Sequence, residues 1–380
     1  MHILRTIETF YPYVTGPTNQ AFRISWELEK RGFHSPILTT YCDVSTQLPS
    51  QENYQGVEVT RYRNQFRLMR YCMSLGMIKG FKEFDLIHSH NYRNFQADLG
   101  VFFSQWKRKP FVLSTHGSLL GYKRYLEGKT AHLPYVLYDF LTFKFTARRA
   151  DRIVVSSQIE HEDALEFGIG EEKLRLIPAG IDLPQGELSD HKKRECLTLL
   201  FVGRIVRNRK LEILIRALPE IANGVELTIV GSEEKTSSVA RGGYLEELIT
   251  LARRLGVDKR VHFTGPRYGD ALIACYCSAD IFVYASQYES FGQPLLEAAA
   301  AGLPVVSTPV GVAKELVKDG ETGYVIEFDN PSMLAARVGL LLDWQVRKKY
   351  SEQLKELVRS NFSWDGIIDR YVQIYRDLTP

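Results

Sequence analysis

The sequence predicts an α/β protein made of two doubly wound domains that face each other across a cleft. Short runs rich in β-branched residues alternate with helical patterns along the chain, and most of these runs are apolar on both faces. Such runs are typical of parallel strands that are covered by helices. The runs form two successive series, separated by a polar segment with proline and glycine at residues 184–196. This segment is the best candidate for a linker.

The strands of the first series are expected at residues 2–7, 35–40, 85–90, 111–116, 152–157 and 174–180. Those of the second series are expected at residues 197–203, 225–231, 261–265, 281–286, 304–308 and 323–328. Residues 1–183 would then form an N-terminal domain, and residues 197–363 a C-terminal domain. Near the end of the chain, one helical face carries Trp364, Ile368, Tyr371, Val372 and Tyr375. Residues 364–380 are therefore expected to form a helix that packs back on the N-terminal domain.

Length and composition limit the class of protein. The 380 residues exceed a single ordinary core, and the 44% hydrophobic and 24% charged residues are typical of a folded globular chain. A net charge of +3, from 48 basic and 45 acidic residues, does not indicate a nucleic-acid partner. The five cysteines are scattered and odd in number, which argues against a disulfide framework. Cys275 and Cys277 lack the further ligands of a zinc site and are expected to be buried structural thiols.

No targeting or membrane-spanning segment is expected in this sequence. Its first residues have the pattern of a strand, without the charged and then apolar regions of a signal peptide. No run of about 18 apolar residues is present. The expected compartment is therefore the cytoplasm.

Residues 288–306, YESFGQPLLEAAAAGLPVV, place two glutamates around a turn that opens a helix. A predicted strand precedes the turn. Pro294 near the first helical position and Gly302 just beyond the last are typical of helix ends. Glu289 is therefore expected in the loop, and Glu297 about one turn into the helix.

The start of this helix is a candidate phosphate site. A helix N-terminus presents free N–H groups and a positive dipole, and Gly292 would let the backbone approach a ligand closely. Two alternative roles stay open for Glu289 and Glu297. They could be acids that simply stabilise the start of a helix, or the acid and the nucleophile of a glycosidase. Eight positions on one helix would separate the two Cα atoms by about 12 Å, whereas glycosidase carboxyls lie about 5 to 9.5 Å apart. The loop position of Glu289 weakens this geometric objection.

A basic cluster follows the first strand of the second series. Arg204 comes directly after this strand, and Arg207, Arg209 and Lys210 lie before the next helix. Cations favour helix C-termini, so a cluster at the N-terminal side suggests a bound anion, although a solvated charge run is the alternative. No Asp-x-Asp motif is present, so a magnesium ion held by carboxylates is not expected. Arginine and lysine would neutralise a diphosphate instead.

Short motifs in a fixed order give the chain a resemblance to a known family. They are DLIHSH, STHG, ADRIVVSS, LIPAGID, FVGRI, LTIVGSEE, LARRLGVDKRVHFTG, CSADIFVYAS, ESFGQPLLEAAAAGLPVVSTPVG and KDGETGYVI. The chain resembles the retaining glycosyltransferases of the GT-B fold, group 1 (sequence family 4). The resemblance covers nearly the whole chain and is strongest over residues 197–328. It implies two Rossmann-like domains, a nucleotide-sugar substrate, and neither a cofactor nor a metal.

The resemblance also implies roles for single residues. Glu297 matches the glutamate that binds the ribose hydroxyls, and Glu289 matches the one beside the donor sugar. Arg204 matches the arginine on the diphosphate, and His116 the histidine near the transferred sugar. The further donor-binding candidates are Gly16, Ser290, Phe291, Gly292, Gln293, Leu295 and Arg267, of which Phe291, Gly292, Gln293 and Leu295 would act through backbone N–H groups.

Two departures from the family pattern affect the phosphate site. The lysine that accompanies Arg204 falls on Lys210 by spacing, but on Arg209 when the following LEILI is aligned. Both stay candidates. The first loop usually carries two adjacent glycines, whereas here Gly16 is followed by Pro17, which lacks an N–H group. Pro17 therefore cannot supply a backbone N–H contact to the diphosphate.

The implied function is transfer of a sugar from a UDP- or GDP-sugar to a saccharide or lipid-linked acceptor in glycan or polysaccharide biosynthesis. Transfer would retain the anomeric configuration and need no metal. Glu289, His116, Arg204 and Lys210 would form the catalytic set. A nucleotide-sugar epimerase or a phosphorylase with the same layout, and a non-catalytic sugar-nucleotide binding protein, stay open as alternatives.

Two basic stretches, residues 61–82 and 140–152, lie in the N-terminal half, which receives the acceptor in this family. Basic amphipathic segments bind anionic membrane surfaces. Peripheral docking on the cytoplasmic face of the membrane is therefore a further expectation. Core helices with solvated basic faces are the alternative.

Overall fold

The computed structural model describes residues 1–68, 70–126, 129–182, 196–233 and 242–379, which form two compact α/β units. Unit 1 consists of Met1–Lys123, Glu127–Ala179 and Trp364–Pro380. Unit 2 consists of Arg124–Leu126 and Gly180–Ser363. The expected linker lies outside the described residues except for its last residue, Cys196.

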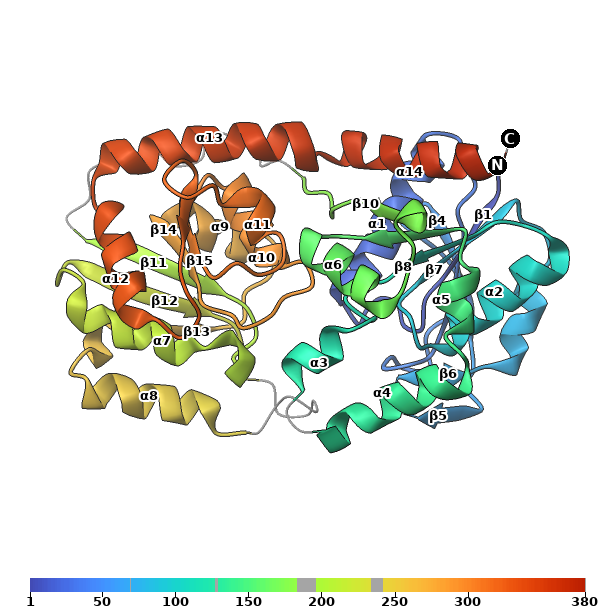
Figure 1. The fold of residues 1–380 in the computed structure, drawn as a ribbon, viewed down its shortest axis with the longest axis horizontal. Helices are drawn as coiled ribbons and strands as arrows, with labels where there is room; N and C mark the ends of the chain where they lie inside the picture. Colours follow the sequence, from blue (N-terminus) through green and yellow to red (C-terminus); the bar gives the residue numbers. More distant parts are fainter. Residues whose placement is uncertain (69, 127–128, 183–195, 234–241, 380) are drawn as a thin grey trace. The chain divides into compact units, whose positions relative to one another are not determined.

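Unit 1 contains a sheet of eight strands (Figure 1). They are β1 (Ile3–Thr6), β2 (Ile37–Thr40), β3 (Gln51–Tyr54), β4 (Val57–Tyr62), β7 (Leu86–His90), β8 (Phe111–Ser114), β9 (Arg152–Val155) and β10 (Leu174–Leu176). Their order is β10-β9-β8-β7-β1-β2-β4-β3, and all neighbours are parallel except β3 and β4. All six strands predicted in the first series are present, because each has the apolar run of a buried parallel strand.

The prediction omits the hairpin of β3 and β4, although the sequence carries a signal for it. Residues VEVTRY of β4 alternate between buried and more exposed positions, with Val57, Val59 and Arg61 buried. Gln55 and Gly56 join the two strands with φ angles of +51° and +94°. Left-handed residues at both positions suit a two-residue hairpin turn. Alternation plus a turn glycine could therefore have identified this hairpin.

The basic stretch at residues 61–82 is not a helix. It contains the end of β4, the antiparallel pair β5 (Phe66–Leu68) and β6 (Tyr71–Met73), and the 3₁₀ helix η1 (Leu75–Gly80). Buried Arg61 lies 2.6 Å from Glu52, and Arg67 lies 2.6 Å from Asp43. Acidic partners therefore neutralise part of the basic surface that the sequence predicts here.

The helices of unit 1 include a C-terminal helix that completes its core. They are α1 (Gly16–Lys30), α2 (Phe95–Lys107), α4 (Lys129–Leu141), α5 (Phe145–Arg149), α6 (Gln158–Phe167) and α14 (Trp364–Leu378), while α3 (Gly121–Tyr125) begins in unit 1 and ends in the short Arg124–Leu126 piece of unit 2. Helix α14 buries the apolar face that the sequence predicts, against Ile24 and Leu28 of α1 and Ile3 of β1. Burying an aromatic or branched side chain contributes about 1.5–3 kcal/mol. The apolar stripe of α14 therefore fixes this helix on the sheet of unit 1.

Unit 2 contains a sheet of six strands, all of them predicted. They are β11 (Leu197–Val202), β12 (Val225–Val230), β13 (Val261–Gly265), β14 (Ile281–Tyr284), β15 (Val305–Ser307) and β16 (Gly323–Val325). Their order is β13-β12-β11-β14-β15-β16, and all neighbours are parallel. The order reverses between β11 and β14. In doubly wound sheets, ligands bind beyond the carboxyl ends of the strands at such a reversal.

Helices cover both faces of the unit 2 sheet. They are α7 (Leu211–Ala217), α8 (Tyr244–Arg254), α9 (Asp270–Ser278), α10 (Gln293–Ala300), α11 (Ala313–Leu316), α12 (Pro331–Leu340) and α13 (Trp344–Phe362). Helices α7, α8 and α12 pack together on one face, and α10, α11 and α13 on the other (Figure 1). This is the doubly wound α/β architecture that the sequence predicts.

The prediction of buried thiols is wrong for Cys275 and Cys277, which are both half-buried. Both lie on α9, whose only buried residue is Tyr276. The remaining α9 side chains, including these thiols, are therefore at least partly accessible. Among the described residues, no helix is long and apolar enough to cross a membrane.

Candidate functional site

The loop after β14 leads into α10 as the sequence predicts. Glu289 lies in this loop, and Glu297 lies on the helix. Gly292 caps the helix with a φ angle of +86°, and Gly302 follows its end with a φ angle of +72°. Both backbone conformations are left-handed and suit glycine. The chain therefore turns sharply into α10, where Pro294 has no N–H group and the Leu295 N–H donates to the Gly292 carbonyl at 2.9 Å.

Glu289 is held by partners from both sides of the strand reversal. The Tyr284 hydroxyl on β14 donates to its carboxylate. Arg209, at the end of the 3₁₀ helix η3 (Arg207–Arg209) that follows β11, forms an ion pair with the same carboxylate. Arg209 also donates to the Ser286 hydroxyl at 3.0 Å and is buried. This ion pair ties the loop after β11 to the loop after β14.

The structure places Arg209, and not Lys210, beside Glu289. Lys210 has a φ angle of +53°, a left-handed conformation that turns the chain into α7. Its ammonium lies 3.1 Å from Asp329 and 3.9 Å from Glu212. The predicted place of Lys210 in the catalytic set is thus not supported by its contacts. Arg209 is the one of the two that contacts Glu289, and its place at the lysine position stays a prediction.

Glu297 faces Tyr276 of α9. The Tyr276 hydroxyl donates to the Glu297 carboxylate at 2.7 Å. Burial raises the pKa of Glu297, while hydrogen bonds from Tyr276 and Gln293 oppose this rise. The Tyr276 hydroxyl therefore orients this carboxylate, which lies about one turn after the start of α10.

Arg204 follows β11 and is exposed at the same edge of the sheet. Burial raises the pKa of the Tyr284 hydroxyl, and the positive charges of Arg209 and Arg204 oppose this rise. Both guanidinium groups therefore act on Tyr284, the residue that also holds Glu289. This edge carries two arginines and one carboxylate, a set that suits an anionic ligand with hydroxyl groups.

A second loop supports the loop after β14. The Val312 N–H group donates to the Phe291 carbonyl at 2.6 Å. Gly311 has a φ angle of +50°, and a Cβ atom there would lie 2.1 Å from the same carbonyl oxygen. Only glycine fits such a close approach. The TPVG segment therefore fixes the backbone whose N–H groups are predicted to bind the donor.

The remaining predicted donor residues differ in their surroundings. Phe291 and Leu295 are buried, Ser290 and Gln293 are half-buried, and Arg267 is exposed in the loop after β13. Gly16 belongs to unit 1, where it begins α1 directly after the cap Thr15. The described contacts therefore gather Glu289, Arg209 and their hydroxyl partners into one cluster, and Arg267 and Gly16 stay predictions from the resemblance alone.

His116 lies at the carboxyl edge of the unit 1 sheet, just after β8. Its φ angle is +47°, and its Nε2 atom lies 2.8 Å from Nδ1 of His90. The carboxylate of Glu160 on α6 accepts hydrogen bonds from the neighbouring Gly117 N–H and Thr115 hydroxyl. Burial and the positive charge of Arg5 lower the pKa of His116 to about 4. The imidazole is therefore neutral near pH 7.

Sequence reasoning missed the buried groups behind His116. His90 and Arg5 contact each other at 2.9 Å, and both are fully buried. Glu8, just after β1, is also buried and accepts hydrogen bonds from Asn91 at 2.9 Å and Asn94 at 3.1 Å. The alternating histidines of HSH at the end of β7 were the available signal, since polar side chains there adjoin the carboxyl edge.

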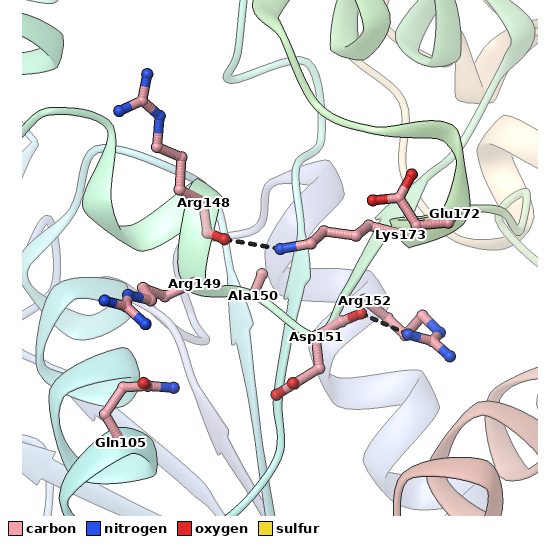
Figure 2. Close-up of a pocket in the computed structure, with 8 residues that line it drawn as sticks. All are labelled: Gln105, Arg148, Arg149, Ala150, Asp151, Arg152, Glu172 and Lys173. Carbon is pink, nitrogen blue, oxygen red and sulfur yellow. Dashed lines mark hydrogen bonds between the residues drawn. The ribbon is translucent and has the colours of Figure 1, made fainter.

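A hollow of about 430 Å³ in unit 1 lies elsewhere. It is lined by Gln105, Arg148, Arg149, Ala150, Asp151, Arg152, Glu172 and Lys173 (Figure 2). Lys173 donates to the Arg148 carbonyl at 2.7 Å. Because β9 begins at Arg152, the hollow adjoins the amino end of this strand, whereas His116 follows the carboxyl end of β8. It is therefore not part of the candidate site.

Two family models match the chain. The model of the group 1 glycosyl transferases matches residues 188–359, and the model of glycosyltransferase family 4 matches residues 14–185. An uncharacterised glycosyltransferase of Methanocaldococcus jannaschii is 30% identical over 92% of this chain and 91% of its own length. A D-inositol 3-phosphate glycosyltransferase of Corynebacterium jeikeium is 28% identical over 82% of this chain and 76% of its own.

Solved structures show the same fold. Anabaena HepE, crystallised with UDP and glucose, superposes with a TM-score of 0.76 at 21% identity over 100% of both chains. The sucrose-phosphate synthase of Thermosynechococcus elongatus superposes with a TM-score of 0.77 at 21% identity, over 100% of this chain and 99% of its own.

Proposed function

The chain belongs to the group 1 glycosyltransferases of the GT-B fold, and on this premise we propose that it transfers a sugar from a nucleoside diphosphate sugar with retention at the anomeric carbon. The acceptor would be a saccharide or a lipid-linked saccharide. The observation that carries the proposal is the cluster of Arg209, Glu289 and Tyr284 at the strand reversal of unit 2. The UDP and glucose named for HepE support a UDP-sugar as the first donor to test.

The residues of unit 2 suit the charge that develops on the leaving group. As the bond between the anomeric carbon and the phosphate oxygen breaks, negative charge grows on the diphosphate. Arg204, Arg209 and the N–H groups at the start of α10 would stabilise this charge. The acceptor oxygen would form the new bond on the same face of the sugar, and its proton would pass to a phosphate oxygen.

The two glutamates would hold the neutral parts of the donor. Glu297 would accept from the ribose hydroxyls, since Tyr276 already orients its carboxylate. Glu289 would accept from a sugar hydroxyl while Arg209 balances its charge. His116 is predicted from the resemblance to contact the transferred sugar. Positioning of this kind lowers the barrier by orienting the anomeric carbon for attack.

The test is direct. Purified protein is incubated with UDP- and GDP-sugars, chosen first by the rise in melting temperature that each produces, and with simple saccharides and lipid-linked acceptors. We expect release of the nucleoside diphosphate and a product whose anomeric configuration, determined by NMR, matches that of the donor. Activity should persist in EDTA. Conversion of the donor without an acceptor would favour an epimerase, and binding without turnover would favour a binding protein.

Glu297→Gln and Glu289→Gln should separate nucleotide binding from sugar turnover. Glutamine keeps an acceptor oxygen for Tyr276 or Arg209. Because Glu289→Gln also removes the charge of a buried ion pair, the thermal unfolding of both variants is measured beside their activity. Glu297→Gln should raise the Kd for free UDP about tenfold, because a hydrogen bond to a charged group is worth about 1.5–3 kcal/mol. Glu289→Gln should leave that Kd unchanged and lower kcat. Isothermal titration with UDP and a turnover assay measure both. Equal losses of UDP affinity would contradict this division of roles.

Helix α4 is the surface that supports docking on a membrane. It exposes 61% of Leu133, 69% of Phe140 and 64% of Leu141, while the hydroxyl of Tyr138 on its other side donates to Asp98. A helix that packs through its polar side and presents an apolar stripe suits the boundary of a lipid headgroup layer. Exposed Arg148, in the basic stretch at residues 140–152, follows the helix. We propose that an anionic lipid surface covers this stripe.

Liposome sedimentation tests this docking. Wild-type protein should pellet with vesicles that contain anionic lipid and should be released partly by high salt. Phe140→Ser with Leu141→Ser should weaken binding about tenfold or more, because each buried apolar side chain contributes about 1.5–3 kcal/mol. Ile273→Ser, at an exposed position on α9 of unit 2, is the matched control and should bind as the wild type does. Binding that is unchanged in the double variant would exclude this surface.

A further inference from the structure

Three histidine rings with nearly parallel planes lie next to one another in unit 1, and the last of them is His116. The rings of His88 and His90 on β7 lie 4.8 Å apart with an interplanar angle of 14°. The rings of His90 and His116 lie 5.1 Å apart with an angle of 11°. Arg5 of β1 lies against the first two rings, with its Nη1 atom 2.9 Å from both His88 Nδ1 and His90 Nε2. A buried cation therefore bridges the first two rings of this row.

The partners of Arg5 are neutral. Besides the two histidines, it donates to the hydroxyls of Ser25 at 3.0 Å and Tyr375 at 3.3 Å. Among the described residues, no carboxylate forms a salt bridge with it. Burying a charge without an opposite charge costs several kcal/mol, and apolar side chains of similar volume would often be at least as stable. Core packing alone therefore does not account for this network.

The donor and acceptor roles along the network follow from Arg5. A guanidinium group only donates hydrogen bonds. Nε2 of His90 must therefore accept, so the proton of this ring is on Nδ1, and a doubly protonated ring is excluded. The Nδ1–H group of His90 lies 2.8 Å from Nε2 of His116 and donates to it. His116 Nε2 thus carries no proton, and a neutral ring has its proton on Nδ1.

The same reasoning places the proton of His88, the other histidine that contacts Arg5. Nδ1 of His88 accepts from Arg5 and lies 2.7 Å from the Tyr375 hydroxyl, which accepts from Arg5 and donates to His88. The proton of His88 is therefore on Nε2, which lies 2.7 Å from the Ser114 hydroxyl. The Arg5 contact thus fixes the proton of each ring, while His88 Nδ1 shares its single lone pair between Arg5 and the Tyr375 hydroxyl.

We infer that Arg5 and His90 are positioning residues that hold His116 as a neutral imidazole with its proton on Nδ1. This inference deepens the proposed function and rests on it in one respect: the Nδ1–H group would donate to a hydroxyl oxygen of the transferred sugar. His116 is then a fixed hydrogen-bond donor and not a general base. The charged and titratable groups around its ring are Arg5, His88 and His90, while Glu160 holds the adjacent Gly117 N–H. Burial and Arg5 lower the pKa of His116, which agrees with this state.

Long-range 1H–15N NMR spectra of the full chain, labelled with 15N-histidine, test the inference without turnover. The His116 signals are identified by their loss in His116→Gln. At pH 7 we expect the wild type to show a neutral ring with the proton on Nδ1. His90→Leu removes the donor to Nε2 and should produce a mixture of tautomers. His90→Asn keeps an amide donor and should restore the wild-type tautomer. His262→Gln, on β13 of unit 2, is the control and should change neither the His116 signals nor the rate.

Turnover gives the second readout. His90→Leu should lower kcat about a hundredfold with little change in KM, the order of loss for a misplaced hydrogen-bond donor, and His90→Asn should recover most of it. A His116 ring that is charged, or protonated on Nε2, in the wild type at pH 7 would overturn the inference. Equal losses in His90→Leu and His90→Asn would overturn the positioning role. If the NMR result is as expected but no sugar transfer is found with any donor, the proposed function fails and the tautomer assignment stands.

Discussion

Arg209→Met should lower kcat at least about a hundredfold, whereas Lys210→Gly should leave it within about threefold of the wild type. Arg209 is buried and paired with Glu289, so its loss also leaves a buried carboxylate without its cation. Breaking such a pair costs about 3–5 kcal/mol of unfolding free energy. Lys210 has a left-handed backbone and contacts Asp329. Glycine suits that conformation and should stabilise unit 2 slightly.

Arg209→Lys distinguishes the effect of losing the positive charge from the effect of losing folding stability. The family resemblance allows a lysine at this position, so this variant should keep the ion pair and most of the activity. Turnover assays and thermal unfolding of the three variants are compared side by side. A loss of kcat in Lys210→Gly as large as that in Arg209→Met would show that the two residues have the opposite roles.

Arg204→Ala should also lower kcat about a hundredfold, and with little change in stability. The Arg204 side chain is exposed at the carboxyl end of β11, so its removal leaves no buried charge. A donor that acts on the departing diphosphate is worth at least about 2.7 kcal/mol in the transition state, which is about a hundredfold in rate. KM should change less than kcat, because the contact strengthens as charge develops.

Arg207→Ala is the matched control for Arg204. Arg207 lies in the same basic loop, but its guanidinium donates to the carboxylate of Glu247 on α8 at 2.8 Å. Exposed pairs of this kind contribute about 0–1 kcal/mol, so stability and turnover should stay close to the wild type. Near-normal kcat in Arg204→Ala, or an equal loss in Arg207→Ala, would contradict the role given to Arg204.

The fold could be predicted where the sequence of an element shows directly which of its side chains are buried. The strands of both units are short apolar runs, and α10 has proline and glycine at its ends, so their sequences carry the physical cause of their structure. The hairpin of β3 and β4 was not predicted because only one face of β4 is buried, and its alternation of buried and more exposed residues covers only six positions.

The candidate site could be predicted only in part. The loop position of Glu289 follows from the strand before it and the helix after it. The choice between Arg209 and Lys210 depends on the backbone conformation at residue 210, which composition does not reveal. Arg5, His88 and His90 are polar residues in buried strands. Their contacts join β1, β7 and α14, so no local pattern in the chain reports them.

The position of α14 in the chain has a consequence for synthesis. This helix contributes Tyr375 to the Arg5 network and much of the unit 1 core, yet it follows the whole of unit 2 in sequence. The ribosome therefore releases the strands of unit 1 long before their covering helix exists. During that interval Ile3, Leu86 and Val112 lack part of their apolar cover, and incompletely covered sheets are prone to aggregate. Residues Gly180–Ser363 of unit 2 form a continuous segment that can fold first, and unit 1 is completed only when α14 leaves the ribosome.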